Sequence, residues 1–451
     1  MVSKANNDVV FPEQSLPTGR TIGLGFQHVI AMFGATVLAP VLMGFDPNLA
    51  VFFSGIGTFI FLLIVRGRIP SYLGSSFAFI GPVLAAKSHG GVPAALGGIA
   101  AASVVYFIIG MLVKTRTGTR AIQILMPPPV TAAVVAVIGI GLAPVAWGSA
   151  SKDWTLALIT LAVAIFVAVA TRGFTKLIPI LIAVVVGYLA AALMGKVDFS
   201  GVAAAAWFGL PSFVTPTISL EAVSLIVPVV VMLVAENIGH VKAVSAYMDR
   251  DLTPEIGNAF IGDAVGTFVS ALGGGTGQTT YAENIGVMSI TKVYSIRPLQ
   301  VAAATAIFLG LVPKFGALIL SIPTPVMGGI SLVLFGMIAG ASTKVISSAT
   351  EDWGSLENFG VYGISIAVCA ALVGVFGANG ALNEALKPAT PLPTTVQIGF
   401  VQLDAIGAAT FFAVLLNLAI VLVKKLSPLA DRSIGRSQTD GQPQPLTAVE
   451  S

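Results

Sequence analysis

Long apolar stretches follow one another along almost the whole sequence. A helix needs about 20 apolar residues to cross roughly 30 Å of bilayer hydrocarbon. Eleven stretches meet or approach this length, at residues 22–43, 48–65, 93–113, 129–149, 154–171, 177–195, 219–241, 299–312, 325–347, 359–377 and 405–423. The sequence therefore predicts an all-α polytopic membrane protein whose surroundings include membrane lipid.

The composition supports the same class of protein. Of the 451 residues, 56% are hydrophobic and 10% are charged, against about 25% charged in soluble proteins. The net charge is only +3 and the basic residues are scattered, so nucleic-acid binding is not favoured. We expect one transmembrane domain at 21–425, a cytoplasmic N-terminal tail at 1–20 and a disordered cytoplasmic tail at 426–451.

Three more segments, at 75–87, 258–272 and 280–291, are apolar but short, polar or rich in glycine. Counting them gives fourteen spans. With a cytoplasmic N-terminus, 18 of the 23 Lys and Arg residues then lie on the cytoplasmic side, as the positive-inside rule requires. Omitting one segment would reverse the side of every later loop, so we predict fourteen spans with both termini cytoplasmic.

Fourteen spans divide into two sevens, and an odd number in each half inverts the second half relative to the first. The sequence carries a weak echo of this arrangement. PPVTAAVVAVIGIGLA from Pro128 resembles PTPVMGGISLVLFGMIA from Pro323. The same register pairs the third span, at 74–82, with the tenth, at 279–288. Chance similarity between apolar segments is the alternative explanation.

The third and tenth spans both contain residues that break helices. Pro70 and Gly74 precede one, and Gly273 to Gly277 precede the other. Broken helices at matching positions of two halves are typical of transporter sites, because half-helix N-termini offer free N–H groups at membrane depth. The alternative is that these glycines only allow helices to pack closely.

Two acidic residues lie within the apolar spans. Glu283 lies in TTYAENIGVMSITK, and Glu236 lies four residues before His240 in LVAENIGHVKAV, on the same helix face. A charge at the bilayer centre costs about 2.5–3.5 kcal/mol on insertion scales, so such residues indicate a binding site or pathway. The alternatives are a helix-end carboxylate in water for Glu236 and a structural hydrogen bond for His240.

Three further polar residues have either a binding or a supporting role. Asp263 lies in FIGDAVGTF, and Gln27 and His28 lie in GFQHVIAMFGA. The chain has three histidines, one cysteine and no HExxH motif, so it lacks the ligands of a zinc site. No Lys-Ser/Thr follows the glycines at 273–277, which excludes a phosphate loop. We expect no enzyme, metal or cofactor; acids inside the membrane favour coupling to protons.

The motifs resemble the nucleobase–ascorbate transporter family, and within it the bacterial uracil permeases. The family signature, Asn-x-Gly preceded by Gln, Glu or Pro and followed by Thr and a basic residue or Gly, fits residues 283–292. FQHVIAMFGATVLAP, IPSYLGSSFAF, AENIGH and TTYAENIGVM also match. The similarity covers nearly all of residues 20–425.

This resemblance implies a seven-plus-seven inverted repeat with short antiparallel strands in spans 3 and 10. It also implies a core domain, at about 21–120 and 219–322, and a gate domain, at about 121–218 and 323–425. The gate often forms a homodimer in relatives. The protein would lie in the bacterial inner membrane and import uracil with protons by alternating access.

Site residues follow from the resemblance position by position. Glu236 and Glu283 would accept hydrogen bonds from ring N–H groups, and backbone N–H groups of Phe77 and Ala282 would meet the ring carbonyls. His240, Glu236 and Glu283 would take part in proton coupling. Ser76 and Tyr281 would complete the substrate contacts, and the supporting residues would be Asn284, Gln27, His28, Asp263 and Thr291.

Two residues favour a pyrimidine over a purine. Purine carriers of the family tend to have Gln at the position of Glu283 and Asp at that of His240. The chain also departs from a close uracil permease, because Ala282 replaces Gly and Asp263 replaces Asn. A xanthine or uric acid symporter is the alternative, followed by an anion exchanger or channel on the same scaffold.

Overall fold

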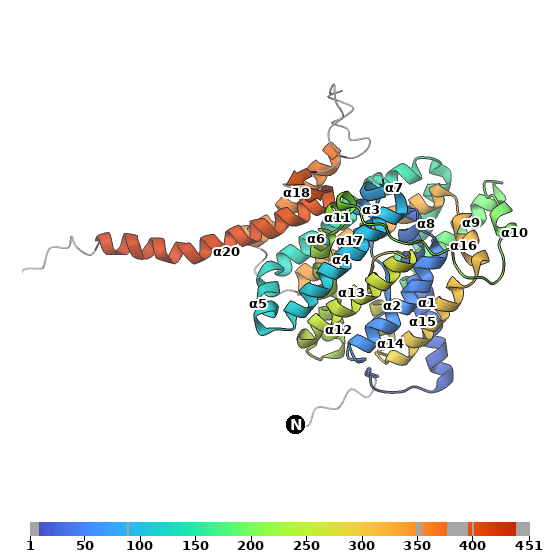
Figure 1. Ribbon diagram of the computed structural model, residues 1–451, viewed down its shortest axis with the longest axis horizontal. Helices are drawn as coiled ribbons and strands as arrows, with labels where there is room; N and C mark the ends of the chain where they lie inside the picture. The colour runs from blue at the N-terminus through green and yellow to red at the C-terminus, as the bar shows by residue number, and fades with distance from the viewer. Residues whose placement is uncertain are drawn as a thin grey trace, which may run out of the picture.

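The computed structural model describes residues 9–87, 90–348, 353, 355–376, 396–398 and 401–438. These residues form a bundle of helices in which segments far apart in the sequence lie side by side (Figure 1). Most buried residues are aliphatic or aromatic, and many large apolar side chains are exposed on the outside. This distribution is the one expected for a protein whose outer surface meets lipid.

One group of helices forms a row in which each member packs against the next. In order, the row is α4 (Gly91–Val113), α13 (Ile256–Gly273), α2 (Pro47–Ile64), α15 (Ile296–Gly310) and α1 (Thr18–Met43). α11 (Leu220–Ile226) and α12 (Val229–Met248) pack beside α4. Local signals fix the turn between α1 and α2: Gly44 ends α1 with a φ of 71°, and the Asp46 side chain caps α2.

The second group of helices is centred on α6 (Pro128–Gly141) and α17 (Thr324–Ser348), which pack against each other. Around this pair lie α7 (Ala143–Ala150), α8 (Trp154–Ala170), α9 (Pro179–Leu193), α18 (Leu356–Phe376) and α20 (Ala405–Gln438). Figure 1 shows α20 projecting from one side of the bundle. α6 and α9 both begin with a proline in their first turn, where a missing N–H costs nothing.

Packing in the first half of the chain is matched in the second half. α4 packs on α13 as α15 packs on α2. In the other group, α8 packs on α9 and α17, and α18 packs on α20 and α6. α4 and α2 lie in the first half of the chain and α13 and α15 in the second, so the α4–α13 contact matches the α2–α15 contact with the two halves exchanged.

Two three-residue strands meet between α2 and α13. β1 (Leu73–Ser75) pairs antiparallel with β2 (Gln278–Thr280), and the central pair of the register is Gly74 with Thr279. One threonine on each flanking helix binds the first residue of the nearer strand. Thr58 Oγ1 of α2 accepts from the N–H of Leu73 at 2.9 Å, and Thr267 Oγ1 of α13 accepts from the N–H of Gln278 at 3.0 Å.

Glycine is required where side chains cross this strand pair. A Cβ on Gly74 would lie 2.4 Å from the ring of Tyr281, and a Cβ on Gly57 would lie 1.8 Å from the side-chain oxygen of Gln278. Each strand leads at once into helix: β1 into the 3-10 helix η1 (Phe77–Phe79) and α3 (Ile80–Lys87), and β2 into α14 (Ala282–Thr291).

The remaining elements are short connections. They are α5 (Arg116–Leu125), η2 (Gly173–Leu177), α10 (Ser200–Ala204), η3 (Thr253–Glu255), α16 (Pro313–Leu320) and the hairpin of β3 (Val396–Ile398) and β4 (Val401–Leu403). α16 follows α15 after a bend of 81°.

Each of the fourteen predicted segments contains helix, and the predicted strands of spans 3 and 10 are present. Among the described residues, however, only 8 helices are long and apolar enough to cross a membrane, or 9 if the bent pair α15–α16 counts as one. The count of fourteen therefore stays a prediction. α20 extends to Gln438, and residues 439–451 lie outside the described part, so the disordered tail at 426–451 stays a prediction.

Candidate functional site

α12 reaches the ends of both strands through two polar side chains. Ser76 Oγ, directly after β1, donates to Glu236 Oε2 at 3.2 Å. The ring nitrogen Nδ1 of His240 and Thr280 Oγ1, at the end of β2, are 2.9 Å apart. Because Glu236 and His240 are four residues apart on α12, they lie one turn from each other on the same face of the helix. α12 and the strand pair therefore form one connected unit.

Ser76 has two roles at this junction. Its Oγ also accepts from the N–H of Ala78 at 3.3 Å, so it caps η1. Its own N–H donates to the carbonyl of Gly277 at 2.9 Å, which extends the contact between the two strand segments. Ser76 is fully buried. The Glu236 carboxylate is thus held by a residue whose backbone is fixed on both sides.

Glu283 lies in the first turn of α14, directly after β2. A helix N-terminus carries a partial positive charge, which favours a carboxylate at this position. The Glu283 side chain is half-buried, and no other side chain in the described ranges donates a hydrogen bond to it. Glu236 and Glu283 lie within electrostatic range of each other.

Phe77 and Ala282 occupy equivalent positions, because each is the first helical residue after a strand. The N–H groups of a helix's first turn have no acceptor within that helix. The Phe77 ring is buried and meets the ring of Phe335 from α17 edge to face, with centroids 6.0 Å apart. Ala282 is exposed. Each junction therefore supplies a backbone N–H group that has no acceptor within its own helix.

Tyr281 lies beneath the strands. Its hydroxyl donates to the carbonyl of Ser75 at 3.0 Å and accepts from Thr36 Oγ1 of α1 at 3.3 Å. The ring crosses Gly74 and is buried. These contacts give Tyr281 the geometry of a residue that holds β1, β2 and α1 together.

Three of the supporting residues belong to two separate hydrogen-bonded pairs. Asn284 Nδ2 of α14 lies 3.1 Å from His28 Nδ1 and donates to the His28 carbonyl at 3.1 Å, which ties α14 to α1. The Asn237 side chain donates to the Asp263 carboxylate, which ties α12 to α13. All four residues are buried. Gln27 Oε1 is buried and has no hydrogen-bond partner within the described part of the chain.

Thr291 lies at the far end of α14 from Glu283. Its Oγ1 donates to the carbonyl of Val287 at 2.8 Å and accepts from the N–H of Val293 at 3.4 Å. Lys292 follows with a φ of 54°. The end of the Asn-x-Gly signature is therefore a helix-ending turn.

Several residues of this region were not predicted from the sequence. Thr280 holds His240, Phe335 packs on Phe77, and Thr58 and Thr267 hold the strands. One signal was present for the last two, because residues 57–59 and 266–268 both read Gly-Thr-Phe. Among the described residues, no cluster of three His, Cys, Asp or Glu side chains could hold a metal ion.

Comparison with known proteins identifies a family and several similar sequences. Residues 19–380 match a family model described as the Permease family. The putative pyrimidine permease RutG of Escherichia coli K12 is 46% identical over 431 residues, which is 92% of each chain. The uracil permease of Bacillus caldolyticus is 44% identical over 83% of this chain and 89% of its own. The uracil permease of Escherichia coli K12 is 38% identical over 91% of this chain and 94% of its own.

Solved structures with a similar fold come from transporters of distant sequence. The transmembrane domain of a cyanobacterium bicarbonate transporter, BicA, has a TM-score of 0.59 at 15% identity, covering 88% of this chain and 96% of its own. The murine Slc26a9 anion transporter in the inward-facing state has a TM-score of 0.64 at 9% identity, covering 91% of this chain and 69% of its own. At such identities the likeness concerns the fold alone.

Proposed function

Because the chain belongs to the Permease family, we propose that it carries uracil into the cell across the cytoplasmic membrane together with protons, by alternating access. It is a membrane transport protein, not an enzyme. Relatives that are 38% to 46% identical over most of the chain are named for uracil or pyrimidine permeation, which supports this substrate.

The observation that carries the proposal is the meeting of two carboxylates with two strand-to-helix junctions. Uracil is a flat, neutral ring in which N–H donors alternate with carbonyl acceptors. Glu236 and Glu283 supply acceptors, and the N–H groups of Phe77 and Ala282 supply donors. Leaving one such buried polar group unpaired costs roughly 1–3 kcal/mol, so the pattern discriminates between rings.

Each side chain then has a defined part in the site. Glu236 and Glu283 accept from the ring N–H groups, and the Phe77 ring packs on the face of the base. Ser76 orients Glu236 through its 3.2 Å hydrogen bond. Tyr281 acts by holding the strands, since its hydroxyl is bonded beneath them. Asn284, His28, Gln27, Asp263 and Thr291 support the helices behind the site.

Proton coupling rests on the same acidic residues. Protonation removes the charge of a carboxylate and therefore lowers the free-energy cost of moving the site across the membrane. Glu236 and Glu283 interact electrostatically, and His240 lies one turn from Glu236 on α12. We place the coupling proton among these three residues.

The architecture we propose has fourteen spans in a seven-plus-seven inverted repeat, with both termini cytoplasmic. The matched packing of the two halves supports it. So do the repeated Gly-Thr-Phe segments, because both threonines hold the first residue of their strand. The core domain comprises about 21–120 and 219–322, and the gate domain about 121–218 and 323–425. We propose a homodimer through the gate.

Two other substrates define the alternatives. A purine symporter for xanthine or uric acid would be expected to have Gln, which can also donate, where Glu283 provides only acceptors. An anion exchanger gains support from the fold, since the similar structures include bicarbonate and anion transporters. Two carboxylates at the site disfavour an anion, because like charges repel.

Uptake of labelled uracil into proteoliposomes with an inward proton gradient tests the proposal. We expect uptake that collapses with a protonophore and that excess xanthine, uric acid and bicarbonate do not inhibit. Glu236→Gln should lose the dependence on the pH gradient. Protonophore-insensitive uptake, or competition by xanthine equal to that by uracil, would reject proton-coupled uracil import.

A further inference from the structure

The residues before α1 form a strap across one end of the bundle. We define the N-terminal strap as residues 9–16. It has no regular secondary structure apart from one parallel β-bridge between Val10 and Val293. Its contacts are with segments that follow α14 and α12, almost 240 to 280 residues further along the chain. The strap therefore connects the end of α12 to the end of α14, which are not adjacent in the sequence.

One side of the strap binds the end of α14. The N–H of Val10 donates to the carbonyl of Lys292 at 2.9 Å, and the N–H of Tyr294 donates to the carbonyl of Val10 at 2.7 Å. Ser295 Oγ donates to the carbonyl of Gln14 at 2.7 Å. Lys292 is the residue of positive φ that ends α14. The helix that begins near Glu283 is thus anchored to the strap where it ends.

The other side of the strap binds the end of α12. Both guanidinium nitrogens of Arg250 donate to the Glu13 carboxylate, at 3.2 and 2.8 Å. The central carbon of the same guanidinium group, Cζ, lies 3.9 Å from the ring centroid of Phe11. Arg250 follows the left-handed residue Asp249 that ends α12, and Ser245 Oγ donates to the Arg250 carbonyl. The helix that carries Glu236 is thus anchored to the same strap.

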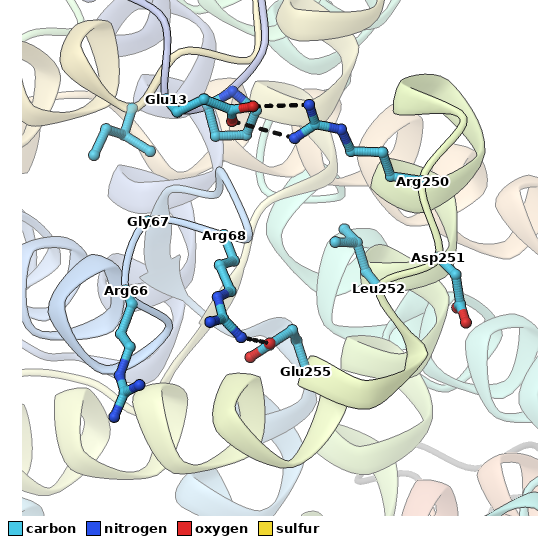
Figure 2. A pocket seen from close by; sticks show the side chains of 10 residues that line it. Glu13, Arg66, Gly67, Arg68, Arg250, Asp251, Leu252 and Glu255 are labelled. Carbon is cyan, nitrogen blue, oxygen red and sulfur yellow. Dashed lines mark hydrogen bonds and ion pairs between the residues drawn. The ribbon is translucent and has the colours of Figure 1, made fainter.

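The strap is less closely packed on its remaining side. A cavity of about 320 Å³ lies between strap residues Pro12 and Glu13 and the loop after α2 at residues 66–68. Figure 2 shows the Glu13–Arg250 pair on one side of this cavity and the Arg68–Glu255 pair on another. The hydrogen bonds and ion pair of the strap are therefore directed to the ends of α12 and α14.

We propose that the strap is a tether that sets the relative position of Glu236 and Glu283, and that Glu13 and Arg250 are positioning residues for the substrate site. Glu236 is fourteen residues from Arg250 and Glu283 is nine from Lys292, or roughly 21 and 14 Å at 1.5 Å per residue. Each helix is held near the site by the strands. Holding its other end prevents it from tilting about that point.

This inference rests on the proposed uracil function, so its test includes a measurement that needs no substrate. The double variant Phe11→Ala/Glu13→Ala removes both contacts with Arg250. Hydrogen exchange of peptides covering the end of α12, at 241–252, should become faster in this variant. The dissociation constant for uracil should rise about threefold or more, within the range for an exposed ion pair plus a cation–π contact.

A disulfide lock separates positioning from general destabilisation. Val10 and Val293 are bridge partners, so their Cα atoms lie about 5 Å apart, within the range of a disulfide. Val10→Cys/Val293→Cys, made with Cys369→Ser to remove the native thiol, fixes the strap without Arg250. Combined with the double alanine variant, the oxidised lock holds the strap on the end of α14 but leaves the end of α12 without its contacts, so exchange at 241–252 should stay fast and uracil affinity should stay low. With Phe11 and Glu13 present, the oxidised lock should leave both at their wild-type values.

Glu357→Gln is the matched control, because it removes the exposed Glu357–Lys424 pair between α18 and α20; it should leave uracil affinity unchanged. The tether is overturned if the double alanine variant keeps wild-type affinity and exchange, or if the oxidised lock restores both without the contacts to Arg250. If the wild type binds no uracil but the exchange difference at 241–252 appears and persists in the oxidised lock, the substrate assignment fails and the tether between the helices stands.

Discussion

Glu283→Gln tests the acceptor role of the Glu283 carboxylate. Gln has nearly the same shape but no charge. A hydrogen bond to a charged group contributes about 1.5–3 kcal/mol and a neutral one about 0.5–1.5 kcal/mol. No other side chain of the described residues donates to Glu283, so no internal partner absorbs the difference. The loss is about 1–1.5 kcal/mol, which corresponds to a rise of about five- to tenfold in the dissociation constant for uracil.

Titration calorimetry on purified protein measures this constant directly, and labelled uptake measures its consequence. The matched control is Glu221→Gln. Glu221 is also an acid in the first turn of a helix, α11, so the control carries the same loss of favourable interaction with the helix N-terminus. We expect Glu221→Gln to bind uracil as the wild type does.

Uracil binding by Glu283→Gln within twofold of the wild type would contradict this prediction. Such a result would mean that the carboxylate makes no charge-assisted hydrogen bond to the ring. A second informative result is increased competition by xanthine in the variant. That outcome would retain Glu283 in the site and make it a determinant of purine against pyrimidine recognition.

Two further predictions concern the strand pair and the N-terminal strap. Gly74→Ala should lower stability by about 1–3 kcal/mol, because the new methyl group would lie 2.4 Å from the Tyr281 ring; thermal unfolding measures this, and Gly148→Ala, which meets nothing within 4 Å, should have no comparable effect. The hydrogen bond from Arg250 lowers the pKa of Glu13 below its usual 4.5, so the stabilisation from this pair should be complete above pH 4.5 and should fade as the pH falls through the lowered pKa. The protection of residues 10–14 from hydrogen exchange, relative to the intrinsic rate at each pH, should therefore fall on acidification, and a protection factor that does not change with pH would contradict the assignment.

Helices were predictable because apolar runs and their flanking Pro and Gly residues are local signals. The segment at 129–149 was predicted as one span, and Pro128–Ala150 is long and apolar enough to cross a membrane as one span; it consists of α6 followed by α7, with Pro144 at the start of the second. The register of the strands was not predictable. It depends on Thr58 and Thr267, which lie 15 and 11 residues from the strand residues that they bind.

The residues of the candidate site were easier to predict from the sequence than the contacts that they make. Apolar surroundings identified Glu236 and Glu283, and helical spacing placed His240 beside Glu236. The partner of His240 is Thr280, forty residues away, which no local pattern indicates. The direction of the Tyr281 side chain was also hidden, because it is set by Gly74 on the other strand.

The shortness of the strand pair has a consequence for how the substrate preference of such a protein can change. Three residue pairs form too small a ladder to be stable alone, so the geometry of the site depends on hydroxyl groups from α2 and α13. A substitution on the strand-facing side of either helix would therefore shift the backbone donors without touching the ligand. Selection can tune affinity in these two helices while every group that contacts the base stays the same.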